Sequence, residues 1–85
     1  MKSFTYTITD PVGIHARPAG LLVKQIKTYQ SEIIIEKDDK QVNGLRLMAL
    51  MGLGVKKGDS ITVQITGADE DQAAEELKGW MEQNL

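Results

Sequence analysis

The sequence predicts one α+β domain of the open-faced sandwich type, in which three helices cover one face of a four-stranded antiparallel sheet. Three observations support this fold. The 85-residue chain is long enough for a single hydrophobic core. Four short segments have the alternating or β-branched pattern of strands. Three further segments have an apolar stripe at helical spacing. Their order along the chain is β-α-β-β-α-β-α, which indicates two layers built on one sheet.

The predicted strands cover residues 2–8, 31–37, 40–43 and 60–66. In the first and last of these segments, apolar residues alternate with polar ones, so one side of each strand can face a core. The two middle segments are separated only by Asp38 and Asp39, which are typical of a tight turn. These two segments therefore predict a hairpin.

The predicted helices cover residues 16 to about 29, residues 44–54, and the segment after Gly67. Pro18 falls in the first turn of the first helix, a position that tolerates proline. The second helix is short and has a glycine at each end. In the third, Asp69 precedes Gln72 by three residues, the spacing of a capping box.

The composition argues against several classes of function. Ten Lys and Arg residues against 12 Asp and Glu residues give a formal net charge of -2, so we expect no nucleic-acid partner. The absence of cysteine excludes disulfide and thiol chemistry, and a single histidine makes a metal site unfavourable, so we expect neither a metal nor a cofactor. No run approaches the ~20 apolar residues of a membrane span, and no signal peptide is recognisable. We therefore expect a cytoplasmic protein without stable membrane association.

The single histidine, His15, comes just before the first predicted helix. Amide groups in the first turn of a helix have no partner within it, and together with the helix dipole they can hold an anion. Arg17 adds a planar set of donors suited to phosphate, and Pro18 fixes the first turn. An imidazole nitrogen placed here could attack phosphorus. The pattern is compatible with a phosphoryl-accepting histidine, but a lone histidine at a helix start is often only a cap or a surface residue.

Three segments carry a family resemblance. GIHARPA at 13–19 resembles the active-site signature of HPr, the histidine-containing phosphocarrier of the bacterial phosphoenolpyruvate-dependent sugar phosphotransferase system. Residues 40–59 and 67–71 resemble two further stretches typical of that family, in the same order and spacing. The resemblance implies the open-faced sandwich. It also implies that the chain is a phosphocarrier rather than an enzyme with turnover.

The same resemblance implies roles for particular residues. Nδ1 of His15 would accept a phosphoryl group from enzyme I and pass it to the A domains of sugar-specific enzymes II, with Arg17 assisting. Ala16 and Pro18 would belong to the binding surface around this histidine. Nothing in the sequence requires a dimer, so we expect a monomer.

The 44–54 segment has more apolar residues than a short helix can bury. Its candidate docking residues are Leu47, Met48 and Met51. Residues sufficient to fill its buried side are Leu50, Leu53 and Val55. At helical spacing the first three could be core residues. The resemblance implies instead an apolar patch exposed to partners, and methionine suits a surface that binds several of them.

Arg46 departs from the family pattern. In HPr of many Gram-positive bacteria the aligned residue is a serine that a dedicated kinase phosphorylates, whereas Arg46 has no hydroxyl group. The resemblance therefore does not imply regulation at this position, and a cation here would favour acidic partner surfaces. Alternatives to the general carrier are a specialised paralogue, an HPr-like interaction protein that binds permease or regulator domains through residues 47–51, and a small anion-binding module.

Overall fold

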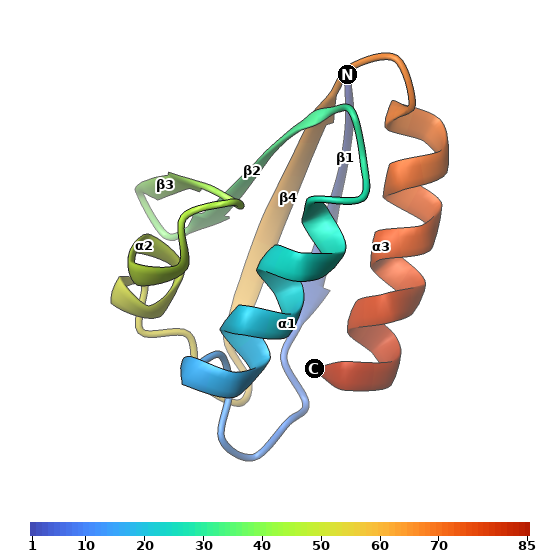
Figure 1. Ribbon diagram of the computed structural model, residues 1–85. Coiled ribbons are helices and arrows are strands. Elements are labelled where there is room, and N and C mark those ends of the chain that lie inside the picture. The colour runs from blue at the N-terminus through green and yellow to red at the C-terminus, as the bar shows by residue number, and fades with distance from the viewer.

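The computed structural model describes residues 1–85. Its elements are β1 (Lys2–Thr7), α1 (Ala16–Ile26), β2 (Glu32–Lys37), β3 (Lys40–Asn43), α2 (Leu47–Gly52), β4 (Ser60–Thr66) and α3 (Glu70–Asn84). The strands form one antiparallel sheet in the spatial order β1-β4-β2-β3, with α1 and α3 side by side across one face and α2 beside β3 (Figure 1). The predicted open-faced sandwich and element order are confirmed. Ile8 and Ser31 lie one residue outside β1 and β2.

The strand register decides which side chains face the helices. Ile33 and Ile35 of β2 lie opposite Ile65 and Val63 of β4, and Phe4 of β1 also lies opposite Val63. The four aliphatic side chains are buried, and Phe4 packs against them at the sheet edge. The opposite face of the sheet has no helix over it, and its residues on β1 and β4 are Ser3, Thr5, Thr7, Ser60, Thr62, Gln64 and Thr66. This polar composition suits a face that stays in contact with water.

Each helix buries one side against the sheet. Leu22 and Ile26 of α1, Leu50 of α2, and Leu77 and Met81 of α3 are almost completely inaccessible to solvent. They belong to one continuous apolar cluster with the strand residues. The remaining sides of the helices can therefore carry charged or apolar side chains that are available for binding.

The first helix is shorter than the prediction of residues 16 to about 29. It ends at Ile26 because the following amides bond to carbonyls three residues back rather than four, Thr28 to Gln25 and Tyr29 to Ile26, both at 3.1 Å. The Thr28 hydroxyl also donates to the Gln25 carbonyl at 2.7 Å. These bonds close a tight turn that leads directly into β2.

The second helix is also shorter, beginning at Leu47 rather than residue 44 and ending at Gly52 rather than residue 54. Asn43 forms a turn before it, with its side-chain oxygen accepting from the Leu45 amide at 2.9 Å and its carbonyl from the Arg46 amide at 3.0 Å. Gly44 fits closely in this turn, because a Cβ atom there would lie 2.7 Å from the end of the Ile26 side chain.

The capping box predicted at the start of α3 is wrong in its bonding. Asp69 occupies the N-cap position, yet its side chain makes no cap hydrogen bond. Its carboxylate instead accepts from the Gln30 amide at 2.8 Å and from the Ser31 hydroxyl at 2.5 Å. These bonds join the start of α3 to the connection between α1 and β2, a tertiary contact that local spacing could not indicate.

Candidate functional site

A short turn leads from β1 to His15. Asp10 organises this turn: its carbonyl accepts from the Gly13 amide at 3.1 Å, and its carboxylate accepts from the Val12 amide at 2.8 Å. The Asp10 amide in turn donates to the backbone oxygen of Leu85, 2.6 Å away. The segment before the histidine is therefore held by bonds within the turn and by the end of the last helix.

The turn is also fixed against the loop that follows α2. Gly13 has a φ of 76°, and a Cβ atom there would lie 2.4 Å from the Val55 carbonyl oxygen and 2.8 Å from Cα of Lys56. Only glycine meets both demands, the left-handed conformation and the close approach. The next residue, Ile14, is buried and donates its amide to the same Val55 oxygen at 3.1 Å. These contacts set the position from which His15 begins α1.

His15 is the N-cap residue of α1, with extended backbone angles of -134° and -162°, and its carbonyl accepts from the Ala19 amide at 2.8 Å. Its exposed imidazole makes no cap hydrogen bond. The amides of Ala16 and Arg17 have no partner, and Pro18 has no N–H group. The predicted residues thus come together at one helix end, with two outward amides and one free imidazole.

The first turn of α1 carries a cation and no acidic residue, although the chain as a whole is negative. Arg17 is exposed and forms no ion pair, and the first turn of α1 contains no acidic residue. Lys24 lies further along the same helix, and Arg46 is the N-cap residue of α2, which itself carries no charged side chain. The acidic residues of the helices are all on α3. An anion at the start of α1 is therefore favoured by local charge and by the helix dipole.

The residues predicted for docking, Leu47, Met48 and Met51, form what we call the α2 patch. Leu47 and Met48 are 38% and 77% exposed, whereas Met51 is half-buried and packs against the core. Met51 therefore contributes to both surface and core. The residues predicted to fill the buried side of this segment are indeed buried, namely Leu50, Leu53 and Val55. Since α2 packs against α1, the patch adjoins the helix that His15 begins (Figure 1).

Four exposed apolar residues escaped the sequence prediction: Met1, Val12, Leu21 and Leu45. Leu21 lies four residues after Arg17 and so on the same side of α1. The signal was available, because Leu21 falls outside the buried stripe of Ala19, Leu22 and Ile26. A single exposed apolar residue is normal on a protein surface, and only a contiguous apolar patch marks a contact surface.

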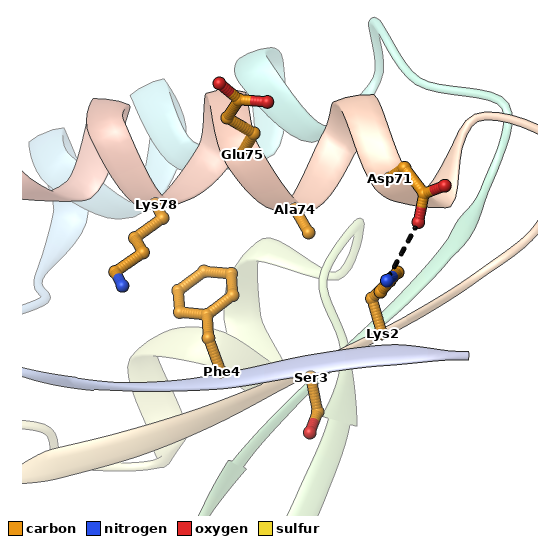
Figure 2. Close-up of a pocket in the computed structure, with 7 residues that line it drawn as sticks. All are labelled: Lys2, Ser3, Phe4, Asp71, Ala74, Glu75 and Lys78. Atoms are coloured by element: carbon orange, nitrogen blue, oxygen red, sulfur yellow. Dashed lines mark ion pairs between the residues drawn. The ribbon is translucent and has the colours of Figure 1, made fainter.

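A shallow hollow lies elsewhere, between β1 and α3. Figure 2 shows the Phe4 ring pointing from β1 toward α3, below Ala74 and beside Lys78, with the ion pair of Lys2 and Asp71 at one end. None of the predicted site residues lines it. No group of three metal-ligating side chains occurs in the structure, and none of its helices combines the length and the apolarity needed to cross a membrane.

Comparison with known proteins identifies the family of this chain. Residues 2–83 match the family model described as the PTS HPr component phosphorylation site. The chain belongs to the HPr family. The phosphocarrier protein HPr of Lysinibacillus sphaericus is 42% identical over 77 residues, covering 91% of this chain and 88% of that protein. The HPr-C-His structure from Thermoanaerobacter tengcongensis has a TM-score of 0.93 and 38% identity, covering 99% of this chain and 94% of that one.

Membership of the HPr family makes the chain a phosphocarrier protein rather than a catalytic enzyme. An HPr dimer from Thermoanaerobacter tengcongensis also matches, with a TM-score of 0.76 and 38% identity over 98% of this chain and 95% of that one. Dimers therefore occur among HPr proteins, and the monomeric state expected for this chain stays a prediction.

Proposed function

We propose that this HPr-family chain accepts a phosphoryl group from enzyme I on Nδ1 of His15 and transfers it to the A domains of sugar-specific enzymes II. The observation that carries the proposal is the exposed His15 imidazole at the N-cap of α1, beside the unpartnered amides of Ala16 and Arg17. Each of these groups faces solvent and can therefore be reached by a partner protein.

The proposed step is a phosphoryl transfer without any cofactor. The lone pair of Nδ1 forms a bond to phosphorus while the bond between phosphorus and the donor breaks, and the donor leaves with that electron pair. Negative charge on the transferring oxygens is stabilised by the two amides and by the Arg17 guanidinium. Pro18 fixes the first turn, so these donors need little rearrangement. Transfer to an enzyme II domain is the same step in reverse, with His15 as the leaving group.

Docking is assigned to the surface around this helix end. The α2 patch and the solvent side of α1 combine exposed apolar side chains with the unpaired cations Arg17 and Arg46. Apolar contacts with several partners suit methionine, and the cations favour partners with acidic surfaces. This role requires the protein in the cytoplasm, as we expected from the sequence.

A second candidate is an HPr-like interaction protein that binds permease or regulator domains through the α2 patch, with phosphoryl transfer as a secondary activity. The observation that favours it is the 77% exposure of Met48, an apolar side chain that a carrier site alone does not require. Because both candidates use the same surface, only a measurement of phosphoryl transfer separates them.

The test is incubation with enzyme I and phosphoenolpyruvate, followed by intact-mass measurement. We expect one added phosphoryl group that is lost in acid and retained in base, as a phosphorus–nitrogen bond requires. The His15→Ala variant should gain none and should keep the parent's circular dichroism spectrum, because the side chain is exposed. If that variant is still phosphorylated, the site is wrong. If the parent gains nothing from an active enzyme I, the interaction protein is the better description.

A further inference from the structure

Lys37, at the end of β2, is surrounded by oxygen atoms from the loop after α2. Its ammonium group lies 3.0 Å from the Gly54 carbonyl, 3.4 Å from the Leu53 carbonyl and 3.1 Å from a carboxylate oxygen of Asp59. The Lys37 side chain is only 19% exposed. An ammonium group has three donors, so it can bond to all three oxygens at once. We call this set of four residues the Lys37 clamp.

The Lys37 clamp holds both ends of the loop formed by residues 53–59. Leu53 is the C-cap residue of α2, and Gly54 follows it. Unpaired carbonyls and the helix dipole favour a cation at this helix end, and the last turn of α2 has no basic residue of its own. Asp59 stands at the other end of the loop, and the same Asp59 oxygen that contacts Lys37 also accepts from the Lys56 amide at 2.9 Å. The residues between are thereby held in one arrangement.

The same loop, residues 53–59, supports the turn before His15. Between the two ends of the clamp lies Val55, whose carbonyl accepts from the Ile14 amide and against which Gly13 packs at a distance only glycine allows. A shift of residues 53–59 would therefore move the turn and with it the start of α1. Bonds between Lys56 and Asp59 fix the loop internally, and backbone bonds of Gly58 and Asp59 to Ile8 tie its far end to the end of β1. Lys37 is the side chain that ties the start of the loop, at Leu53 and Gly54, to β2.

We propose that Lys37 is a positioning residue for phosphoryl transfer at His15, an inference that rests on the proposed function. It acts through the Lys37 clamp and the bond between Ile14 and Val55, without any contact of its own with His15 or Arg17. The clamp also holds the end of α2, so it sets the α2 patch relative to the acceptor histidine. Lys37 thus holds α2 in a fixed position relative to His15 at the start of α1.

The charge state of the clamp is consistent with this role at neutral pH. The Lys56 amide and the Lys37 side chain, in that order of effect, hold the pKa of Asp59 below its ordinary value of 3.8. The Asp59 carboxylate is thus ionised at neutral pH. Other charged groups on the same loop are Lys56 and Lys57, both exposed and both cationic, so no second carboxylate of the loop competes for Lys37.

The experiment compares Lys37→Met, which keeps the aliphatic stem, with Lys37→Arg, which restores a cation. Lys40→Met is the matched control, because Lys40 pairs with Lys37 across the hairpin, is exposed and forms no ion pair. We expect the rate of phosphorylation by enzyme I at saturating carrier to fall about tenfold in Lys37→Met, less than the ~100-fold that a misplacement of 1 Å can cost. Lys37→Arg should recover most of it, and Lys40→Met should equal the parent.

Amide hydrogen exchange of Ile14 gives a readout that does not depend on transfer. Loss of the Lys37 clamp should speed exchange of this one amide, relative to the amides of β4, in Lys37→Met but not in Lys40→Met. Equal Ile14 exchange and equal transfer in Lys37→Met and the parent would overturn the inference. So would a loss of transfer that Lys37→Arg fails to recover.

If Lys37→Met does not fold, Asp59→Asn provides the same test, because it removes the ion pair and leaves an amide oxygen as acceptor. A parent protein that enzyme I cannot phosphorylate would instead contradict the proposed function. Ile14 exchange would still decide whether Lys37 controls the turn.

Discussion

At the residue scale, Gly13 and Arg17 have opposite environments. Gly13 is fixed by its surroundings, since both its backbone angle and the adjacent Val55 oxygen exclude a side chain. Arg17 has no such surroundings, because it is exposed, forms no ion pair and lies in a helix turn without acidic residues. Exposed arginine is common on protein surfaces, so the role proposed for Arg17 depends on a measurement of transfer.

Replacing Arg17 by alanine should therefore slow phosphoryl transfer while leaving stability within about 0.5 kcal/mol of the parent. In the proposed mechanism the guanidinium acts on charge in the transferring group rather than on the fold. Transfer rates from enzyme I at limiting carrier concentration and urea midpoints provide the two measurements. Lys24→Ala is the control, since it removes a cation from the other end of the same helix. Transfer by Arg17→Ala at the parent's rate would remove this residue from the mechanism.

At the scale of the elements, α3 contains a glycine that its packing does not require. A Cβ atom at Gly79 would meet no atom within 4 Å, and its backbone is helical. Gly79→Ala should therefore stabilise the protein by roughly 0.5 to 1 kcal/mol, because alanine loses less backbone freedom on folding. Urea unfolding measures the change. Gly58→Ala should have the opposite sign, since Gly58 also has open space around it but a φ of 90°. Stabilisation by both variants would contradict this explanation.

The junction between α3 and the start of β2 should be sensitive to acid. Hydrogen bonds from the Ser31 hydroxyl and the Gln30 amide lower the pKa of Asp69 from its ordinary value of 3.8. The folded state thus binds a proton at this carboxyl less readily than the unfolded chain does. Its contribution to stability is present above pH 3.8 and is lost as the pH falls through the lowered folded-state pKa.

The measurement is the urea midpoint from neutral pH to below 3.8. Asp69→Asn should lower the midpoint at neutral pH and should lose less stability than the parent on acidification. Asp39→Asn, at an exposed carboxyl in the hairpin turn, should keep the parent's dependence on pH. An equal loss in the parent and Asp69→Asn would show that these bonds do not couple the two segments.

On the scale of the whole molecule, local patterns predicted the order of the elements and the helix end at His15. Alternation in β4 and the position of Pro18 depend on neighbouring residues, which a sequence displays directly. The helix bounds were wrong because local turns end α1 and precede α2, and the other errors came from contacts between distant segments. Asp69 bonds to Ser31, 38 residues away, rather than capping α3, and Gly44 is required by the approach of Ile26. The sequence did not indicate the role proposed for Lys37, because nothing near this residue in sequence identifies Asp59 as its partner.

The position of β1 in the sheet also determines when the fold can be completed. β1 is an edge strand whose only neighbour is β4, and the Thr7 hydroxyl meets that of Ser60 across a separation of 53 residues. The hairpin of β2 and β3 closes over a short loop, whereas joining β1 to β4 must overcome the chain entropy of most of the molecule. During synthesis β1 leaves the ribosome first and stays without a strand partner until β4 has emerged. The turn that presents His15 bonds to Val55 and Leu85, so these bonds can form only after both segments have emerged.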